Sequence, residues 1–474
     1  MKAPHALVVA YDFPPHAAIG TMRTLRVVRQ LSTEGWRVTV ITSEPSSYRP
    51  GTAVDEALLA QVPAGVRIVR AGTFRGFESL KSWAKSMRTR RPTPPHPGVS
   101  HGRGIAGRKR SSLAKLVDAV DGVLAIPDQE SGWLLPAVRA AMQATATDQP
   151  DVLFSSAPPW TGQLVALVLS HRLGCPWVAD FRDPWARAPW RDDRSRLARW
   201  GASLLERQVV RTADRVVFVA QGNREDFERH YPATFRRKFV TVSNGCDPAE
   251  FEGLNAGAAS VDPFVLLHAG SLYAGRTPLP LFRALARAIS AGLIDPSRFR
   301  LRFLGAQGMH SVDLPGAVRE LGLERVVEFA SRVPRRQGLQ AMAQASGLLL
   351  LQPGHTASVP GKLYEYMALG RPIFAVAEEG ETAELVRKAG HGVSVIPDDE
   401  DAISEALVAF LRYPQGLVKK PDPGLFDGML RARELVQLLG TIVQTPRDRM
   451  SSAPATASVE SESTTGTMEG THTP

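Results

Sequence analysis

The chain has 474 residues, 43% of them hydrophobic and 22% charged, which excludes a disordered polymer and suits a soluble protein of two domains. Its formal net charge of +10 leaves nucleic acid, anionic substrates and anionic membrane surfaces open as partners. Two cysteines and no run of about 20 apolar residues exclude a disulfide framework and a membrane-spanning helix, so we expect a cytoplasmic protein.

The N-terminal segment predicts a strand, a helix and a second strand. Residues 6–10 form a short apolar run, typical of a buried strand rather than a signal peptide, and residues 21–32 have helical spacing. The loop between them lacks GxGxxG, so a dinucleotide fingerprint is not supported. Gly20 ends this loop, where it either lets the backbone approach a phosphate or is a simple turn glycine. Arg23, one turn inside the helix, either points to the side of the sheet on which this loop lies or is an exposed surface arginine.

A basic stretch follows in the first half of the chain. Ten Lys or Arg residues and no acidic residue lie between Glu78 and Asp118, around a Pro/Gly run. We expect a flexible insertion at about residues 85–112, which is either a solvated loop or a contact to anionic lipid, at about 1 kcal/mol per cation. Nucleic acid is not expected as a partner, because aromatic residues are not interleaved with these charges.

Polar residues follow a predicted strand at residues 176–180. The string FRDPW places Asp180, Arg182 and Asp183 at the carboxyl end of this strand, where the chemistry of parallel sheets is usually found. The alternative is a loop ion pair combined with a helix cap. Further on, the string NGCD after a strand at residues 239–244 is expected to be a structural turn.

The second half begins with a strand at residues 264–269. Gly270 and Ser271 form the turn after it, and Arg276 precedes a helix, which suits phosphate binding, although a surface arginine is the alternative. Val333 follows another strand, and the neighbouring Arg332, Arg335 and Arg336 are interpreted as surface charge.

The most informative stretch is residues 348–384. An apolar strand at 348–351 leads through a turn-rich segment to a helix at 362–369 and a second strand at 373–377. Lys362 and Glu365 share one face of the helix, where a cation suits phosphate and a carboxylate suits two sugar hydroxyls. An ordinary βαβ unit with a solvated pair is the alternative. The acidic run at 398–401 indicates a helix cap, and no DxD motif follows a strand, so no metal is expected.

The string PGKLYEYMALGRPI resembles the donor-site signature of retaining glycosyltransferases of the GT-B fold, glycosyltransferase family 4 or group 1, and FRDPW and NGCD add to this resemblance. The resemblance implies an α/β fold of two Rossmann-like domains, with parallel sheets facing across a central cleft. The expected divisions are an acceptor-side domain at residues 1–250, a linker at 251–261, a nucleotide-sugar domain at 262–424, a helix at 425–445 crossing back to the first domain, and a disordered tail at 446–474.

The resemblance also implies a reaction and its residues. The enzyme would move a hexose from a nucleoside-diphosphate sugar to a glycan or lipid-linked acceptor with retention, without a metal or other cofactor. The expected setting is polysaccharide or glycolipid synthesis at the inner face of the cell membrane. Asp183 would lie beside the acceptor, and Glu365 would hold the ribose. The expected donor-binding residues are Gly20, Ser271, Arg276, Val333, Ser358, Gly361, Lys362 and Glu365.

One position departs from the family pattern. The family commonly has two glutamates eight positions apart, and this chain has Glu365 at the second but Ala357 at the first. The sugar therefore stays open, with His355, Thr356 or Ser358 as substitute contacts. A nucleotide-sugar epimerase of the GT-B fold and a non-catalytic partner protein stay open as alternative functions.

Overall fold

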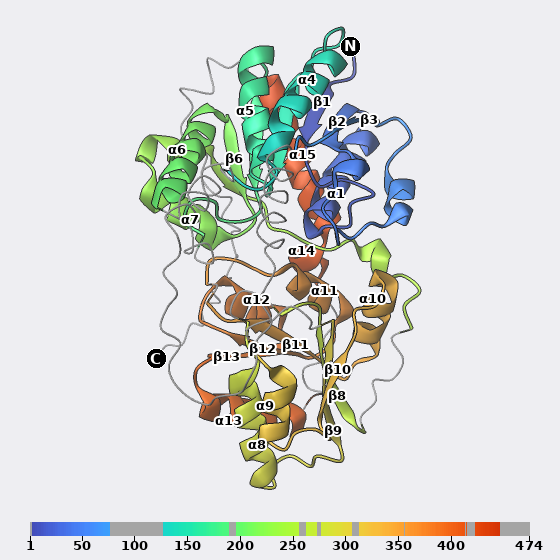
Figure 1. The fold of residues 1–474 in the computed structure, drawn as a ribbon, viewed down its shortest axis with the longest axis vertical. Helices are drawn as coiled ribbons and strands as arrows, with labels where there is room; N and C mark the ends of the chain where they lie inside the picture. The colour runs from blue at the N-terminus through green and yellow to red at the C-terminus, as the bar shows by residue number, and fades with distance from the viewer. Residues whose placement is uncertain are drawn as a thin grey trace, which may run out of the picture.

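A computed structural model describes residues 2–75, 127–188, 196–255, 262–272, 276–305, 312–354, 356–412, 414 and 422–445. The expected basic insertion at residues 85–112, most of the expected linker, His355 and the segment after residue 445 lie outside these ranges. The described chain folds into two α/β domains, each built on one parallel sheet (Figure 1).

The first domain has a seven-stranded parallel sheet in the order β3-β2-β1-β4-β5-β6-β7. The inner strands β1, β4 and β5 are buried along their whole length because helices cover both faces of the sheet. The strands are β1 (His5–Val9), β2 (Arg37–Ser43), β3 (Arg67–Ala71), β4 (Val152–Ala157), β5 (Trp177–Phe181), β6 (Arg215–Phe218) and β7 (Phe239–Thr241).

The helices of this domain form two layers. One core cluster packs α4 (Leu134–Ala144), α5 (Thr161–Leu173), α6 (Arg196–Thr212) and α7 (Gln221–His230) against the sheet. The other packs α1 (Ile19–Thr33) and the last helix, α15 (Gly428–Gln444), against the opposite face. Short 3₁₀ helices connect these elements: η1 (Pro45–Ser47), η2 (Glu56–Gln61), η3 (Ser131–Trp133), η5 (Ala233–Lys238) and η6 (Pro248–Phe251).

The second domain has a six-stranded parallel sheet in the order β10-β9-β8-β11-β12-β13. Its strands are β8 (Phe264–Ala269), β9 (Phe299–Leu304), β10 (Val327–Ala330), β11 (Gly347–Gln352), β12 (Ile373–Ala377) and β13 (Gly392–Val395). One face packs on α8 (Leu279–Ser290), α9 (Leu314–Glu320) and α13 (Glu400–Arg412). The other packs on α10 (Arg335–Gln344), α11 (Gly361–Leu369), α12 (Glu381–Ala389) and α14 (Pro423–Phe426).

The chain passes between the domains twice, at adjacent places. Cys246 N–H donates to the Phe426 carbonyl at 2.8 Å, and Gly428 N–H donates to the Cys246 carbonyl at 2.7 Å. Asp427 ends α14 and caps α15 by accepting from the N–H groups of Met429 and Leu430, so the apolar run expected as one helix is divided in two. In Figure 1, α15 lies beside α1 in the first domain, although it follows the whole second domain in sequence.

The predicted α/β fold class, with two Rossmann-like domains, is confirmed. The strand order reverses between β1 and β4 in the first sheet and between β8 and β11 in the second. Parallel sheets bind ligands outside the carboxyl ends of their strands, at such reversal points. These two places therefore are where a site should be sought.

Candidate active site

The reversal point of the second sheet lies next to a helix N-terminus. The strand β8 ends at Ala269, and Gly270 turns the chain with a φ of +103°, a conformation that favours glycine. On the other side of the reversal point, β11 leads to α11, which begins at Gly361 with Pro360 in the capping position and no side-chain cap. The first N–H groups of α11 can therefore receive an anion.

Lys362 reaches from this helix to the turn after β8. Its Nζ lies 3.4 Å from Nε2 of His268, and a Cβ at Gly270 would lie 2.8 Å from the same Nζ. Burial, and after it the charge of Arg276, lower the pKa of Lys362 to about 8, although the charge of Glu365 acts in the opposite direction. The ammonium group therefore lies in a desolvated place with a second cation nearby, which is an arrangement that an anion would stabilise.

Two further predicted donor residues lie in the segment after β8. Arg276 is 8% exposed and precedes α8, and its charge also lowers the pKa of His268. Ser271 is half-buried in the turn between Gly270 and the fully buried Leu272. The structure thus brings Arg276 and Lys362, which are far apart in sequence, to one edge of the sheet.

Glu365 lies one turn further along α11 and has an arginine partner. Its Oε1 accepts from Nη1 of Arg335 at 3.0 Å, and Nε of the same arginine donates to Glu250 at 2.5 Å. Arg336 donates to the carbonyls of Glu250 and Glu252 at 2.9 and 2.8 Å. Arg335 and Arg336 are exposed, as expected of surface charge, and they also connect α10 to the segment that leaves the first domain.

Val333 is half-buried in the loop between β10 and α10, next to these arginines. The Glu365 side chain is still 18% exposed, so a ligand can reach the carboxylate.

The position expected to hold the first glutamate contacts the other domain. A Cβ at Gly222, in the first turn of α7, would lie 2.9 Å from Cα of Ala357. Gly222 N–H also donates to Oε2 of Glu381 at 3.0 Å. The carboxyl end of β6 therefore meets the loops after β11 and β12, and a large side chain at 357 would collide with α7 unless the domains moved.

Ser358 is held from two sides. Its carbonyl accepts from the Thr382 hydroxyl at 3.0 Å, and Gln352 Nε2 lies 3.4 Å from both its carbonyl oxygen and its Oγ. Gln352 is 1% exposed and its Oε1 has no hydrogen-bond partner among the described residues. Sequence reasoning missed Gln352, although a glutamine that ends an otherwise apolar strand was a visible signal.

A second polar group occupies the reversal point of the first sheet. Asp12, in the loop after β1, lies 3.4 Å from Nη2 of Arg182 and 3.0 Å from Nδ1 of His16. The Arg182 guanidinium also donates to the carbonyl of Pro158 and fills the space that a side chain at Gly20 would need. Sequence reasoning missed Asp12 and His16, although both stand in the loop that directly follows a buried strand.

The predicted cluster of Asp180, Arg182 and Asp183 is divided by the fold. Asp180 is fully buried and accepts from Nη2 of Arg23 at 2.9 Å and from the Ser156 hydroxyl at 2.7 Å. Arg23 also donates to the carbonyls of Val242 and Ser243. Because these carbonyls bind a side chain rather than a neighbouring strand, β7 ends at Thr241 and not at residue 244 as expected.

The interpretation of Arg23 as a surface arginine is therefore wrong, because it is a buried structural arginine. Asp183 follows Arg182 at the carboxyl end of β5 and is half-buried. It therefore lies at the same edge of the first sheet as the polar loop after β1.

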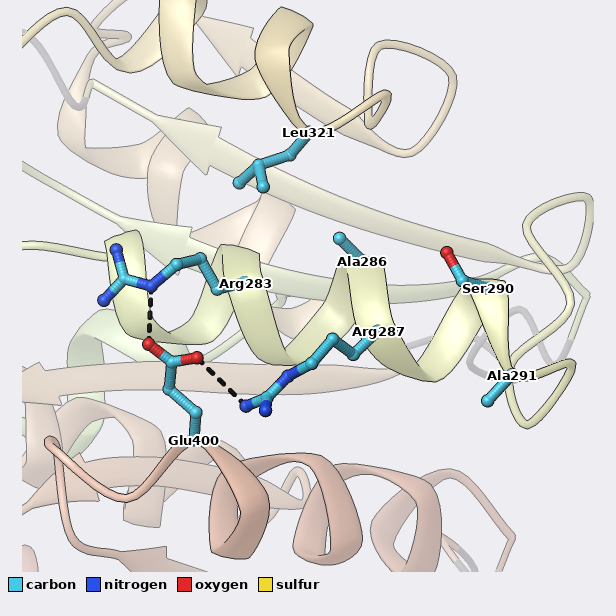
Figure 2. A pocket seen from close by; sticks show the side chains of 7 residues that line it. All are labelled: Arg283, Ala286, Arg287, Ser290, Ala291, Leu321 and Glu400. Atoms are coloured by element: carbon cyan, nitrogen blue, oxygen red, sulfur yellow. Dashed lines mark hydrogen bonds and ion pairs between the residues drawn. The ribbon is translucent and has the colours of Figure 1, made fainter.

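Figure 2 shows a hollow on the outer surface of the second domain, between α8 and α13. Glu400 accepts from Nε of Arg283 at 2.5 Å and from Nη2 of Arg287 at 2.9 Å, so the charges at this hollow are already paired. The helices α8 and α13 cover a face of the sheet, away from the strand ends that carry the cluster around Lys362. We therefore do not place the active site there.

Two family models match the chain. One, described as Glycosyltransferase Family 4, matches residues 21–250, and another, described as Glycosyl transferases group 1, matches residues 263–413. The search of curated proteins finds no match. No helix in the described part of the chain is long and apolar enough to cross a membrane.

Solved structures resemble the whole described fold. Sucrose-phosphate synthase from Thermosynechococcus elongatus is 16% identical with a TM-score of 0.63, covering 93% of this chain and 99% of its own. The catalytic domain of starch synthase IV from Arabidopsis thaliana, bound to ADP and acarbose, is 12% identical with a TM-score of 0.57, covering 95% and 100%. An enzyme described as a UDP-N-acetylglucosamine 2-epimerase from Listeria monocytogenes is 11% identical with a TM-score of 0.53, covering 94% and 98%. At these identities the likeness shows the two-domain GT-B fold alone.

Proposed function

Because the chain is a glycosyltransferase family 4-like protein with the GT-B fold, we propose that it transfers a hexose from a nucleoside-diphosphate sugar to a glycan or lipid-linked acceptor, with retention. One observation supports this proposal above the others. Lys362, Arg276 and the uncapped N-terminus of α11 converge at the point where the strand order of the second sheet reverses. Two cations and a helix N-terminus are suited to a diphosphate.

The donor would lie along the carboxyl ends of β8 and β11. The N–H groups of Gly361 and Lys362 and the charge of Arg276 would hold the diphosphate, and Ser271 and Ser358 would line its two sides. Glu365 would accept from the ribose hydroxyls, with Arg335 keeping its carboxylate in place at 3.0 Å. Val333 would frame the base through its backbone. Gly20 would approach the donor from the first domain, where Arg182 now lies against it.

Catalysis would depend on stabilising the leaving diphosphate. Charge develops on the phosphate oxygen as the bond to the sugar breaks, and fixed cations stabilise that charge without having to reorganise. We propose that Lys362 and Arg276 supply this charge, so that no metal is required. Asp183 would lie beside the acceptor. Attack on the face from which the diphosphate departs gives retention and needs no dedicated protein nucleophile.

A panel of nucleotide sugars tests this proposal on the full-length protein. Released nucleotide is measured for each donor, with and without cell-derived glycan and lipid acceptors, and the sugar product is identified by mass spectrometry. Acceptor-dependent release with an α-configured product from an α-configured donor supports retaining transfer. Addition of a chelator should leave that rate unchanged.

Two other outcomes would replace the proposal. An isomerised sugar formed without acceptor would establish an epimerase, a candidate kept because Ala357 provides no carboxylate at the sugar position. Binding of none of the donors would establish a non-catalytic partner protein. We further propose that the basic residues at 85–112, which lie outside the described residues, hold the protein at an anionic membrane surface, and sedimentation with vesicles containing anionic lipid tests this.

A further inference from the structure

His268 is a buried histidine that none of the roles above uses. It lies on β8 and is 1% exposed, and its Nδ1 lies 3.1 Å from the carbonyl oxygen of Leu349 on the neighbouring β11. A carbonyl oxygen only accepts, so in the neutral ring Nδ1 carries the hydrogen and Nε2 has a lone pair that can accept. The backbone of Gly270 also acts on this imidazole. Burial and the charge of Lys362 lower the pKa of His268 well below its usual value, which is consistent with this neutral form.

The lone pair of His268 faces the ammonium group of Lys362. Nε2 and Nζ are 3.4 Å apart, so the ammonium group donates one of its three hydrogens to the imidazole. The charged groups that act on Lys362 are Arg276, which lowers its pKa, and Glu365, which raises it. Gly270 adjoins Nζ on the strand-end side, since a Cβ there would lie 2.8 Å away.

We propose that His268 is a positioning residue, which holds the Lys362 ammonium group over Gly270 so that its remaining hydrogens point to the diphosphate. This inference rests on the proposed function, because it takes the anion at this edge to be that of a nucleotide sugar. A lysine side chain has many rotamers, and ordering it costs free energy. A fixed acceptor orders the side chain before the ligand arrives, so the imidazole would favour binding without touching the ligand.

The alternative is that His268 only fills the core, where its ring lies 5.7 Å from that of Phe303. Two substitutions separate these roles. His268→Phe keeps an aromatic ring and removes the acceptor, whereas His268→Gln places an amide oxygen near the position of Nε2. His391→Phe is the matched control, because His391 is also 1% exposed but precedes β13, at the opposite end of the sheet.

The first measurement needs no ligand. The rate of reductive methylation of Lys362 is followed against pH in each full-length variant by peptide mass spectrometry. His268→Phe should lower the titration midpoint below that of the wild type, because the charged ammonium loses its acceptor. His268→Gln and His391→Phe should keep the wild-type midpoint. An unchanged midpoint in His268→Phe would overturn the inference.

The second measurement uses inorganic pyrophosphate and calorimetry at pH 7. His268→Phe should weaken binding about tenfold, and His268→Gln less than about threefold. Equal weakening in both would also overturn the positioning role, since only the acceptor distinguishes them. If wild-type protein binds no pyrophosphate, the proposed diphosphate site fails, whereas the titration still decides the role of His268. Should His268→Phe not fold, His268→Asn is used instead of it in both measurements, because its shorter side chain places no acceptor within reach of Lys362.

Discussion

Gly222 and Ala357 contact each other across the two domains, so closely that a Cβ at Gly222 would lie 2.9 Å from Cα of Ala357. The same glycine donates its N–H to Glu381. A residue of the first domain thus adjoins position 357, where the resemblance stated above implies a glutamate. The small side chains on both sides therefore belong to one interdomain contact.

Gly222→Ala should part the domains in this region. The new methyl group would lie 2.9 Å from Cα of Ala357, which is too close for two carbon atoms, so the two domains must move apart here. Overpacking of this kind costs about 1–3 kcal/mol. Small-angle X-ray scattering should show a larger radius of gyration than for the wild type. Gly162→Ala is the control, because a Cβ there meets its nearest atom only at 3.7 Å. An identical radius for all three proteins would contradict this prediction.

Pyrophosphate binding should weaken as the pH rises through about 8, the pKa of Lys362 in the free protein. An anion stabilises the ammonium form and raises this pKa, so binding above pH 8 takes up a proton and becomes less favourable. Calorimetry in two buffers of different ionisation enthalpy measures that proton. Lys362→Arg stays charged over this range and should bind with little dependence on pH. A similar loss of affinity in Lys362→Arg would show that another group titrates.

Glu365→Ala should weaken the binding of nucleoside diphosphates about tenfold or more, because hydrogen bonds to a charged group contribute about 1.5–3 kcal/mol. The affinity for inorganic pyrophosphate should change much less, since it has no ribose. Glu379→Ala is the control, because that carboxylate is exposed and pairs with Arg387. Near-normal affinity of Glu365→Ala for the nucleotide would show that Glu365 does not bind the ribose.

Asp183→Ala should impair transfer more than donor binding. We propose that Asp183 lies beside the acceptor, so the turnover rate should fall about a hundredfold while the donor dissociation constant changes less than about threefold. Stopped-assay turnover and calorimetry measure the two quantities. A parallel loss of both would place Asp183 at the donor instead.

Asp180→Asn should destabilise the protein strongly. Arg23 is 3% exposed and Asp180 is fully buried, so the substitution leaves a buried guanidinium without its carboxylate, at a cost of about 3–5 kcal/mol. Urea unfolding should show a clearly lower midpoint. Arg224→Ala removes one partner of a half-exposed helix pair and should cost less than about 1 kcal/mol. Equal midpoints for the two variants would contradict a structural role for the Arg23–Asp180 pair.

The elements of the second domain were predictable because local pattern decides them. Four leucines at 348–351 are buried in β11, and α11 ends at Leu369 before Gly370, whose left-handed conformation suits glycine. The first domain was less predictable at its ends. The run at 239–244 looks like one strand, but Arg23, more than two hundred positions earlier, takes its last carbonyls.

The sequence by itself determined the fold class and the stretch in which Lys362 and Glu365 lie, because apolar periodicity and turn residues act locally. Only the tertiary structure decided which partners these residues have. Lys362 adjoins His268, Glu365 pairs with Arg335, and Ala357 adjoins Gly222, all through contacts between segments far apart in the chain. Such pairings depend on how the helices pack on the sheets and how the two domains pack on each other, and no local sequence pattern specifies that packing.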